Sequence, residues 1–169
     1  SHYHLPDGDL DSGVHELDRL GTAQVCIFSF TGVWADEQPG NDLVAAAVAA
    51  HPERFVGFTL LNPHRGREAM LAELERGAAM GLRGIKLIPH YQGYPEEGPL
   101  LDVACAWAHE HCQLILNHSW GSAAQLERLV STYPGACGLG SHDRYLLDQV
   151  ARRIVELDDG LEEYPPGWA

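Results

Sequence analysis

The sequence predicts an α/β fold built around a parallel β-sheet. Short apolar or β-branched runs alternate with amphipathic stretches along the whole chain, which is the pattern of successive βα units. The 169 residues are 45% hydrophobic and 21% charged. That composition is typical of one folded domain and excludes a disordered or collagen-like chain.

Six segments are predicted to form the strands, because each is an apolar or β-branched run of strand length. In chain order they cover residues 2–5, 24–30, 54–61, 84–88, 114–118 and 137–141. Six βα units are too few for a closed barrel, which needs eight strands and about 250 residues. The sheet is therefore either open and doubly wound, or part of a larger fold.

The segments between the strands are predicted to be helices, because their apolar residues recur at helical spacing. Leu71, Leu74 and Ala78, for example, share one stripe. The predicted helices cover residues 11–20, 42–50, 68–80, 100–112, 123–133 and 144–157, and residues 158–169 are expected to form a loop or tail.

Residues with special roles at helix ends support these boundaries. Asn41 is expected to cap the second helix, and Ser122 with Gln125 forms a capping-box pattern. Gly21 and Gly81 each follow a predicted helix, where a left-handed residue commonly ends it.

The charge and the cysteines narrow the classes of function. With 11 Lys and Arg against 24 Asp and Glu, the formal net charge is −13, which disfavours nucleic acids and anionic membranes as partners. The longest apolar run, residues 43–50, is too short to span a bilayer, and we expect no leader segment. The four cysteines show no C-x-x-C pairing, so we expect free thiols and a cytoplasmic location.

Three histidines predict a metal site. His2 and His4 are two residues apart on a predicted strand, so both imidazoles project from one face and can chelate one ion. His118 ends another apolar strand, where polar groups of an α/β sheet line the ligand site. Together they favour a hydrolytic zinc-type site. The alternatives are an accidental pair near the terminus and a buried structural His118.

Other polar residues are candidates for the same site. Lys86 lies inside an apolar strand, where burying its ammonium is costly unless the group is paired or used; the alternative is a lysine that snorkels to the sheet edge. His90 and Tyr91 follow at the strand exit, where they could contact substrate or close a loop. His142 and Asp143 offer an acid/base and a carboxylate ligand, although Asp143 could equally cap a helix.

These motifs resemble those of the amidohydrolase superfamily, in its amidohydrolase-related branch of metal-dependent hydrolases and decarboxylases. The resemblance covers about residues 1–135. The segments that carry it include Ser-His-Tyr-His-Leu at the start, His-Pro-Glu-Arg-Phe-Val-Gly-Phe at residues 51–58, Gly-Leu-Arg-Gly-Ile-Lys-Leu at residues 81–87 and Leu-Ile-Leu-Asn-His-Ser at residues 114–119.

The resemblance implies a (β/α)8 TIM barrel, incomplete here with about six βα units, and a divalent metal, expected to be zinc, at the carboxyl ends of the strands. His2, His4 and His118 match the family's metal-ligating histidines. His142 could match the proton-transferring histidine of the sixth strand, or Asp143 the metal-binding aspartate of the eighth, but not both without a collapsed gap. We therefore expect the chain to be a piece of a longer barrel.

The resemblance predicts a hydrolase that uses a metal-activated water on a small amide, lactone or other carbonyl substrate. In this scheme His142 moves the proton, and Lys86 holds an anionic substrate group or the developing negative charge. A non-oxidative decarboxylase of a small carboxylic acid uses the same metal ligands. The expected domain is a partial metal-dependent hydrolase barrel in residues 1–157. A third hypothesis is a non-catalytic, degenerate barrel fragment that binds a ligand or partner. Exposed sheet edges lead us to expect a homo-oligomer.

Overall fold

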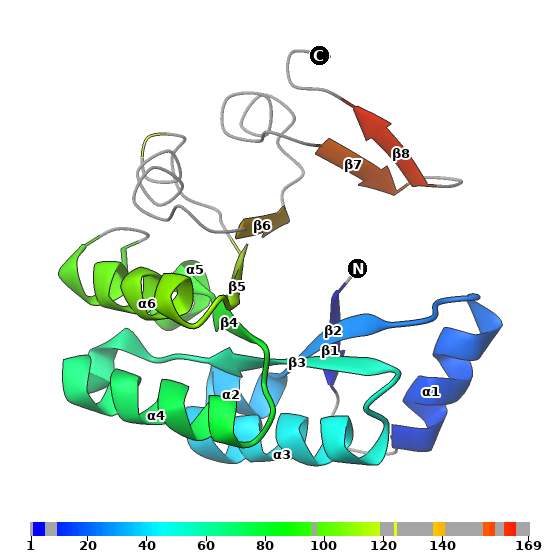
Figure 1. Ribbon diagram of the computed structural model, residues 1–169, viewed down its shortest axis with the longest axis horizontal. Helices are drawn as coiled ribbons and strands as arrows, with labels where there is room; N and C mark the ends of the chain where they lie inside the picture. The colour runs from blue at the N-terminus through cyan, green and yellow to red at the C-terminus, as the bar shows by residue number, and fades with distance from the viewer. Residues whose placement is uncertain are drawn as a thin grey trace.

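A computed structural model describes residues 2–5, 10–95, 98–118, 124, 137–140, 154–157 and 161–164. Six parallel strands form one sheet in the order of the sequence, as in a β/α barrel (Figure 1). The strands are β1 (His2–Leu5), β2 (Val25–Ser29), β3 (Phe55–Leu60), β4 (Gly84–Leu87), β5 (Leu114–His118) and β6 (Cys137–Gly140). The fold class is thus the predicted one, an α/β fold of the TIM-barrel type with six strands in its sheet.

Helices connect successive strands, as the alternating pattern predicts. In Figure 1, α3 and α4 lie along the same side of the strands that they follow. The helices are α1 (Leu10–Arg19), α2 (Phe30–Trp34), α3 (Glu37–Ala50), the 3-10 helix η1 (Pro63–Arg65), α4 (Arg67–Ala79), α5 (Pro89–Gln92) and α6 (Pro99–Glu110). The helices α2 and α5 are not among the predicted ones, because helices of five and four residues are too short to show helical periodicity.

The start of α3 corrects one prediction. Asp36, not Asn41, is its N-cap, and the Asp36 side chain accepts a hydrogen bond from the backbone of Gln38 at 3.3 Å. Asn41 is buried inside the helix, where its Oδ1 accepts from Leu60 N at 2.9 Å and its Nδ2 donates to Leu60 O at 3.0 Å. Its amide joins α3 to β3 instead of capping the helix. The predicted glycine ends are confirmed, with φ +64° at Gly21 and +91° at Gly81.

The C-terminal part departs from the predicted helix at residues 144–157. Ile154–Leu157 forms the strand β7, which pairs antiparallel with β8 (Leu161–Tyr164) in the expected tail. The β-branched Ile154 and Val155 favour a strand here. Ser122 and Gln125, and all of the predicted helix at residues 123–133 except Ala124, lie outside the described residues.

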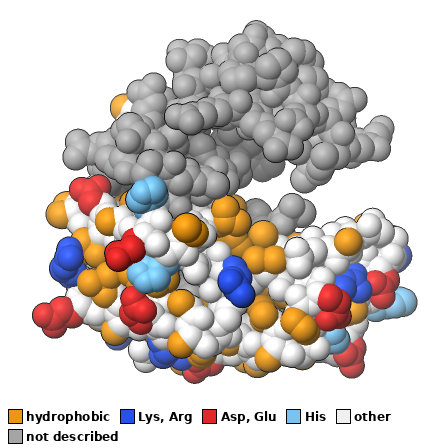
Figure 2. All heavy atoms as spheres, viewed as in Figure 1, with side chains coloured by type: hydrophobic (Ala, Val, Ile, Leu, Met, Phe, Trp, Pro, Cys, Tyr) orange, Lys and Arg blue, Asp and Glu red, His pale blue; other side chains and the backbone are white. Residues whose placement is uncertain are grey.

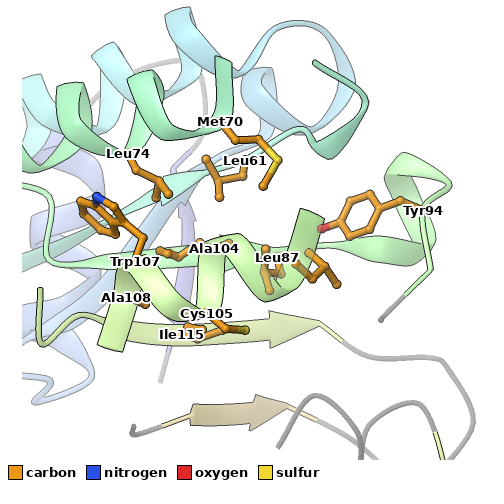
Figure 3. Packing of buried hydrophobic residues seen from close by; sticks show 12 residues of the cluster. Leu61, Met70, Leu74, Leu87, Tyr94, Ala104, Cys105, Trp107, Ala108 and Ile115 are labelled. Atoms are coloured by element: carbon orange, nitrogen blue, oxygen red, sulfur yellow. The ribbon is translucent and has the colours of Figure 1, made fainter. Parts of the chain in front are cut away.

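The helix-covered side of the sheet holds two apolar clusters. One packs α4 and α6 against the strands, with Leu74 of α4 beside Trp107 of α6 and Met70 of α4 beside Leu61 (Figure 3). The other packs α1 and α3 against β2 and β3, through Leu17, Val25, Ile27, Val44, Ala47, Phe55 and Leu82. This layering fixes the sheet from one side and leaves its opposite side for the site.

We call the opposite side of the sheet the inner face. Its buried cluster includes Phe28 of β2, Phe58 and Leu60 of β3, and Leu116 of β5 packs against it. The alternation of strand residues separates these side chains from the helix-side clusters. In a β/α barrel the face opposite the helices is the barrel interior.

The described surface carries mixed charges. Acidic, basic and hydrophobic side chains are interspersed on the face drawn in Figure 2. Among the described residues, no helix has the length and apolar character needed to cross a membrane. Cys26, Cys105 and Cys112 are free thiols, as predicted for them.

Candidate active site

Lys86 is a cation buried on the inner face. It lies on β4 beside Leu60 of β3 and Leu116 of β5, and only 1% of its surface is exposed. This burial contradicts the alternative of a lysine that snorkels to the sheet edge. The Lys86 Nζ atom lies 4.6 Å from the centroid of the Phe28 ring, whose face attracts a cation. The contact with Phe28 is the interaction that the sequence alone did not identify.

Burial sets the charge behaviour of Lys86. Removal from water lowers the pKa of its ammonium from 10.5 to about 8. Lys86 takes part in none of the ion pairs found among the described residues. Near neutral pH the group is therefore mostly a buried cation without a carboxylate partner in this part of the chain, which suits it to an anionic ligand.

His118 stands at the carboxyl end of β5, on the same side of the strand as Leu116 by the two-residue period. Leu116 is registered with Lys86, so strand spacings of about 4.8 Å and about 3.3 Å per residue place the Cα atoms of Lys86 and His118 about 8 Å apart. The His118 ring is half-buried, and its Nε2 atom is fully buried. Lys86 and His118 are thus inner-face residues of adjacent strands.

Aromatic side chains border His118. The ring centroid of Tyr91, on α5, lies 5.5 Å from that of His118, at an interplanar angle of 67°. Trp34, the last residue of α2, meets Tyr91 edge-on at 5.1 Å. We call Trp34, Tyr91 and His118 the aromatic group. Of the two predicted substrate contacts, Tyr91 belongs to this group, and the exposed His90 lies beside it, with its ring centroid 6.0 Å from that of Tyr91.

The register of β1 relates the remaining histidines to this face. His2 pairs with Cys26 and His4 with Phe28, the residue whose ring contacts Lys86. The side chains of His2 and His4, and the whole of His142 and Asp143, lie outside the described part of the structure. Within the described part, no three His, Cys, Asp or Glu residues could hold a metal ion. The predicted ligand set therefore stays a prediction.

Two residues of the region were not singled out from the sequence. No pattern in the sequence around Trp34 indicates that it lies near the site, because the short helix α2 that places it there has too few residues to be recognised. Asn117, immediately before His118, is 1% exposed and its Oδ1 is fully buried. Asn117 could have been noticed in the sequence as an amide inside an otherwise apolar strand, since burying a polar group costs free energy unless it is hydrogen-bonded.

The sequence matches a known protein family. The sequence model described as Amidohydrolase matches residues 21–158, a range that contains Lys86, Tyr91 and His118. A search of the curated proteins found no match.

Solved structures share the fold at low sequence identity. A dihydroxybenzoic acid decarboxylase from Polaromonas sp., with bound manganese and the inhibitor 2-nitroresorcinol, is 18% identical with a TM-score of 0.59, over 78% of this chain and 53% of that one. A probable 2-pyrone-4,6-dicarboxylic acid hydrolase from Acinetobacter baumannii, with citric acid bound, is 17% identical with a TM-score of 0.58, over 82% and 51%. A 4-oxalomesaconate hydratase from Rhodopseudomonas palustris is 14% identical with a TM-score of 0.52, over 73% and 41%. The chain spans about half the length of these structures.

Proposed function

Because the chain belongs to the amidohydrolase family, we propose that it is a metal-dependent hydrolase that uses a metal-activated water on a small amide, lactone or other carbonyl substrate. The observation that carries the proposal is the buried lysine Lys86 on β4, next to the strand β5 that ends with His118 on the same face of the sheet. In barrels of this type, polar groups near the carboxyl ends of strands form the active site.

Of the proposed metal ligands, the structure describes the side chain of His118 alone, and its chemistry suits a divalent metal. His118 contributes a buried ring nitrogen at a strand end, and imidazole suits zinc as well as other divalent ions. His2 and His4 would complete the histidine ligands, with Asp143 as the carboxylate. We favour zinc, while the Polaromonas decarboxylase holds manganese. When bound, the ion supplies Lewis-acid activation of water and of the substrate carbonyl.

Lys86 would bind the anionic part of the substrate. A buried ammonium attracts an anion more strongly than an exposed one, because little water screens the interaction. The Phe28 ring holds the ammonium from one side. The same charge would stabilise negative charge that develops on the substrate during the reaction.

Tyr91 and His142 take the remaining roles in this scheme. The ring of Tyr91 borders His118 and is 40% exposed, so it can contact substrate and keep water from part of the site. His90 would contact substrate farther out on α5. His142 is our candidate for moving the proton to the leaving group.

A second candidate is a non-oxidative decarboxylase of a small carboxylic acid. Lys86 favours it, since a buried cation with no ion pair among the described residues suits a substrate carboxylate. The aromatic group offers ring edges beside His118 that a planar acid could pack against.

A panel of reactions tests the two candidates. The full chain, loaded with zinc or manganese, is incubated with small lactones, amides and aromatic or unsaturated carboxylic acids. Hydrolysis of a lactone or amide that is lost in His118→Ala is the result we expect. Release of carbon dioxide without hydrolysis would instead establish the decarboxylase. A metal-loaded chain that turns over no member of the panel would contradict both and favour a ligand-binding barrel fragment.

The other expectations about the protein stay predictions. We propose that copies of the chain associate, because β1 and β6 are the edge strands of the described sheet and an uncovered edge favours pairing. Sedimentation of the purified chain at two concentrations would detect this, and a monomer at both would contradict it. A small-molecule substrate, the lack of nucleic-acid or membrane partners and the cytoplasmic location rest on the sequence alone.

A further inference from the structure

Trp34 is a large apolar side chain that the core does not use. It is 64% exposed, although the neighbouring Val33 on the same helix is buried in the inner-face cluster. A scattered exposed aromatic is common on protein surfaces. Trp34 differs because its ring is engaged by a second aromatic ring that itself touches His118.

The helix that carries Trp34 is held in place at its start and in its middle. The Ser29 side chain caps the start of α2 by accepting a hydrogen bond from Thr31 N at 3.1 Å. The middle of α2 is in close contact with α3, since a Cβ atom at Gly40 would lie only 2.5 Å from the backbone nitrogen of Gly32. The close contact leaves α2 little room to shift, so the position of Trp34 is well defined.

Tyr91, in contrast, sits on the single turn of α5. This helix has four residues and ends at Gly93, whose φ of +69° is left-handed. One turn has few hydrogen bonds of its own, so its side chains depend on contacts with neighbouring elements. The edge-on contact with Trp34, at 5.1 Å and 86°, is such a contact and has a favourable aromatic geometry.

We propose that Trp34 is a positioning residue, which holds the Tyr91 ring against the imidazole of His118. The contacts run in sequence from the well-held helix α2 to Trp34, to Tyr91 and to His118. The inference rests on the proposed function insofar as His118 is a metal ligand there. Whether Trp34 fixes the surroundings of His118 can be tested without metal and therefore independently of the proposed function.

The first measurement follows the His118 ring directly. The full chain with 13C-labelled histidines is studied by NMR without metal at one fixed pH, and the His118 resonance is assigned by its loss in His118→Gln. We expect Trp34→Ala to move this resonance, because the adjacent Tyr91 ring changes its place. Trp34→Phe, which keeps an aromatic edge, is expected to restore most of the wild-type position. Leu20→Ala is the matched control, since Leu20 is also exposed, at 60%, but lies in the turn immediately after α1.

The second measurement is zinc affinity by competition with a chelator. Loss of one aromatic edge contact is expected to weaken binding about two- to tenfold in Trp34→Ala, with little change in Trp34→Phe or Leu20→Ala. An unmoved His118 resonance in Trp34→Ala, or an equal movement in Leu20→Ala, would overturn the proposal.

If Trp34→Ala does not fold, Trp34→Leu is compared with Trp34→Phe by the same criteria. If the wild-type chain binds no zinc, the proposed function fails, while the resonance still decides the role of Trp34.

Discussion

Polar groups are buried on both faces of the sheet, but their surroundings differ. On the helix side, Asn41 donates to Glu73 Oε1 at 2.7 Å, and Arg76 also donates to that carboxylate at 2.7 Å. Arg76 further pairs with Asp42, so one connected network links α3, α4 and, through Asn41, the backbone of β3. Every charge in this helix-side network faces a partner of the opposite charge.

The inner face presents Lys86 in a different setting. Its Nζ faces the Phe28 ring, and the neighbours in register, Leu60 and Leu116, are apolar. Burial without a carboxylate partner in the described part of the chain costs stability, as the lowered pKa of Lys86 indicates. The polar groups of the helix-side network are buried together with partners of opposite charge or with hydrogen-bond partners, so the structure itself explains their burial. For Lys86, the anionic ligand proposed above would supply the missing partner.

Replacement of Lys86 by the similarly shaped Met is the change that tests this distinction most strongly. Lys86→Met should lower turnover of the best substrate by about 10²- to 10³-fold, because a preorganised charge is lost. At neutral pH the same variant should be more stable than the wild type, since the cost of burying an ammonium disappears. Steady-state kinetics and urea unfolding measure the two effects. A variant that is less stable and equally active would make Lys86 a structural residue.

Replacement of Glu73 should lower the stability of the protein and leave its turnover unchanged, the opposite of what we expect for Lys86→Met. Glu73 is 4% exposed, and Glu73→Leu leaves Asn41 and Arg76 without their shared acceptor. We expect the free energy of unfolding to fall by about 2 to 3 kcal/mol with turnover retained below the melting temperature. Asp42→Asn is the matched control, because Asp42 is 57% exposed and its ion pair is worth less than about 1 kcal/mol. An equal decrease in the free energy of unfolding in Glu73→Leu and Asp42→Asn would mean that the buried carboxylate contributes no more to stability than the exposed one.

The pH dependence of stability offers a smaller, independent test. Because the pKa of Lys86 is about 8 in the folded chain and 10.5 in its ordinary state, the unfolded chain binds more protons between these values. The free energy of unfolding should therefore rise with pH from about 8 to about 10.5, by at most about 1.4 kcal/mol per pH unit relative to Lys86→Met. Urea unfolding of both proteins at several pH values gives the difference, and parallel curves would show that Lys86 is not desolvated.

The sequence predicts the repeating parts of the fold well, for a physical reason. A buried parallel strand is a continuous apolar run, so β5 has the predicted bounds Leu114–His118, and β3 and β4 differ only at their ends. Asn41 was misjudged because an asparagine near a helix start favours a cap, while its tertiary partners Leu60 and Glu73 were invisible in the sequence.

The candidate site could be predicted only in part. Lys86 and His118 stood out because polar residues in apolar strands signal either a partner or a function. The Phe28 ring beneath Lys86 and the contact of Trp34 with Tyr91 depend on strand register and on two short helices. No local pattern encodes such contacts between distant segments, so the structure was needed to find them.

Metal content is the most direct test of the claim that the inner face carries a catalytic site. Elemental analysis of the purified full chain, after zinc loading and removal of free metal, should give about one ion per chain for the wild type. His15→Ala, which changes an exposed histidine of α1, should match it, and His118→Ala should fall well below it. A wild-type chain that retains no metal, or a His118→Ala variant that retains as much as the wild type, would contradict the account.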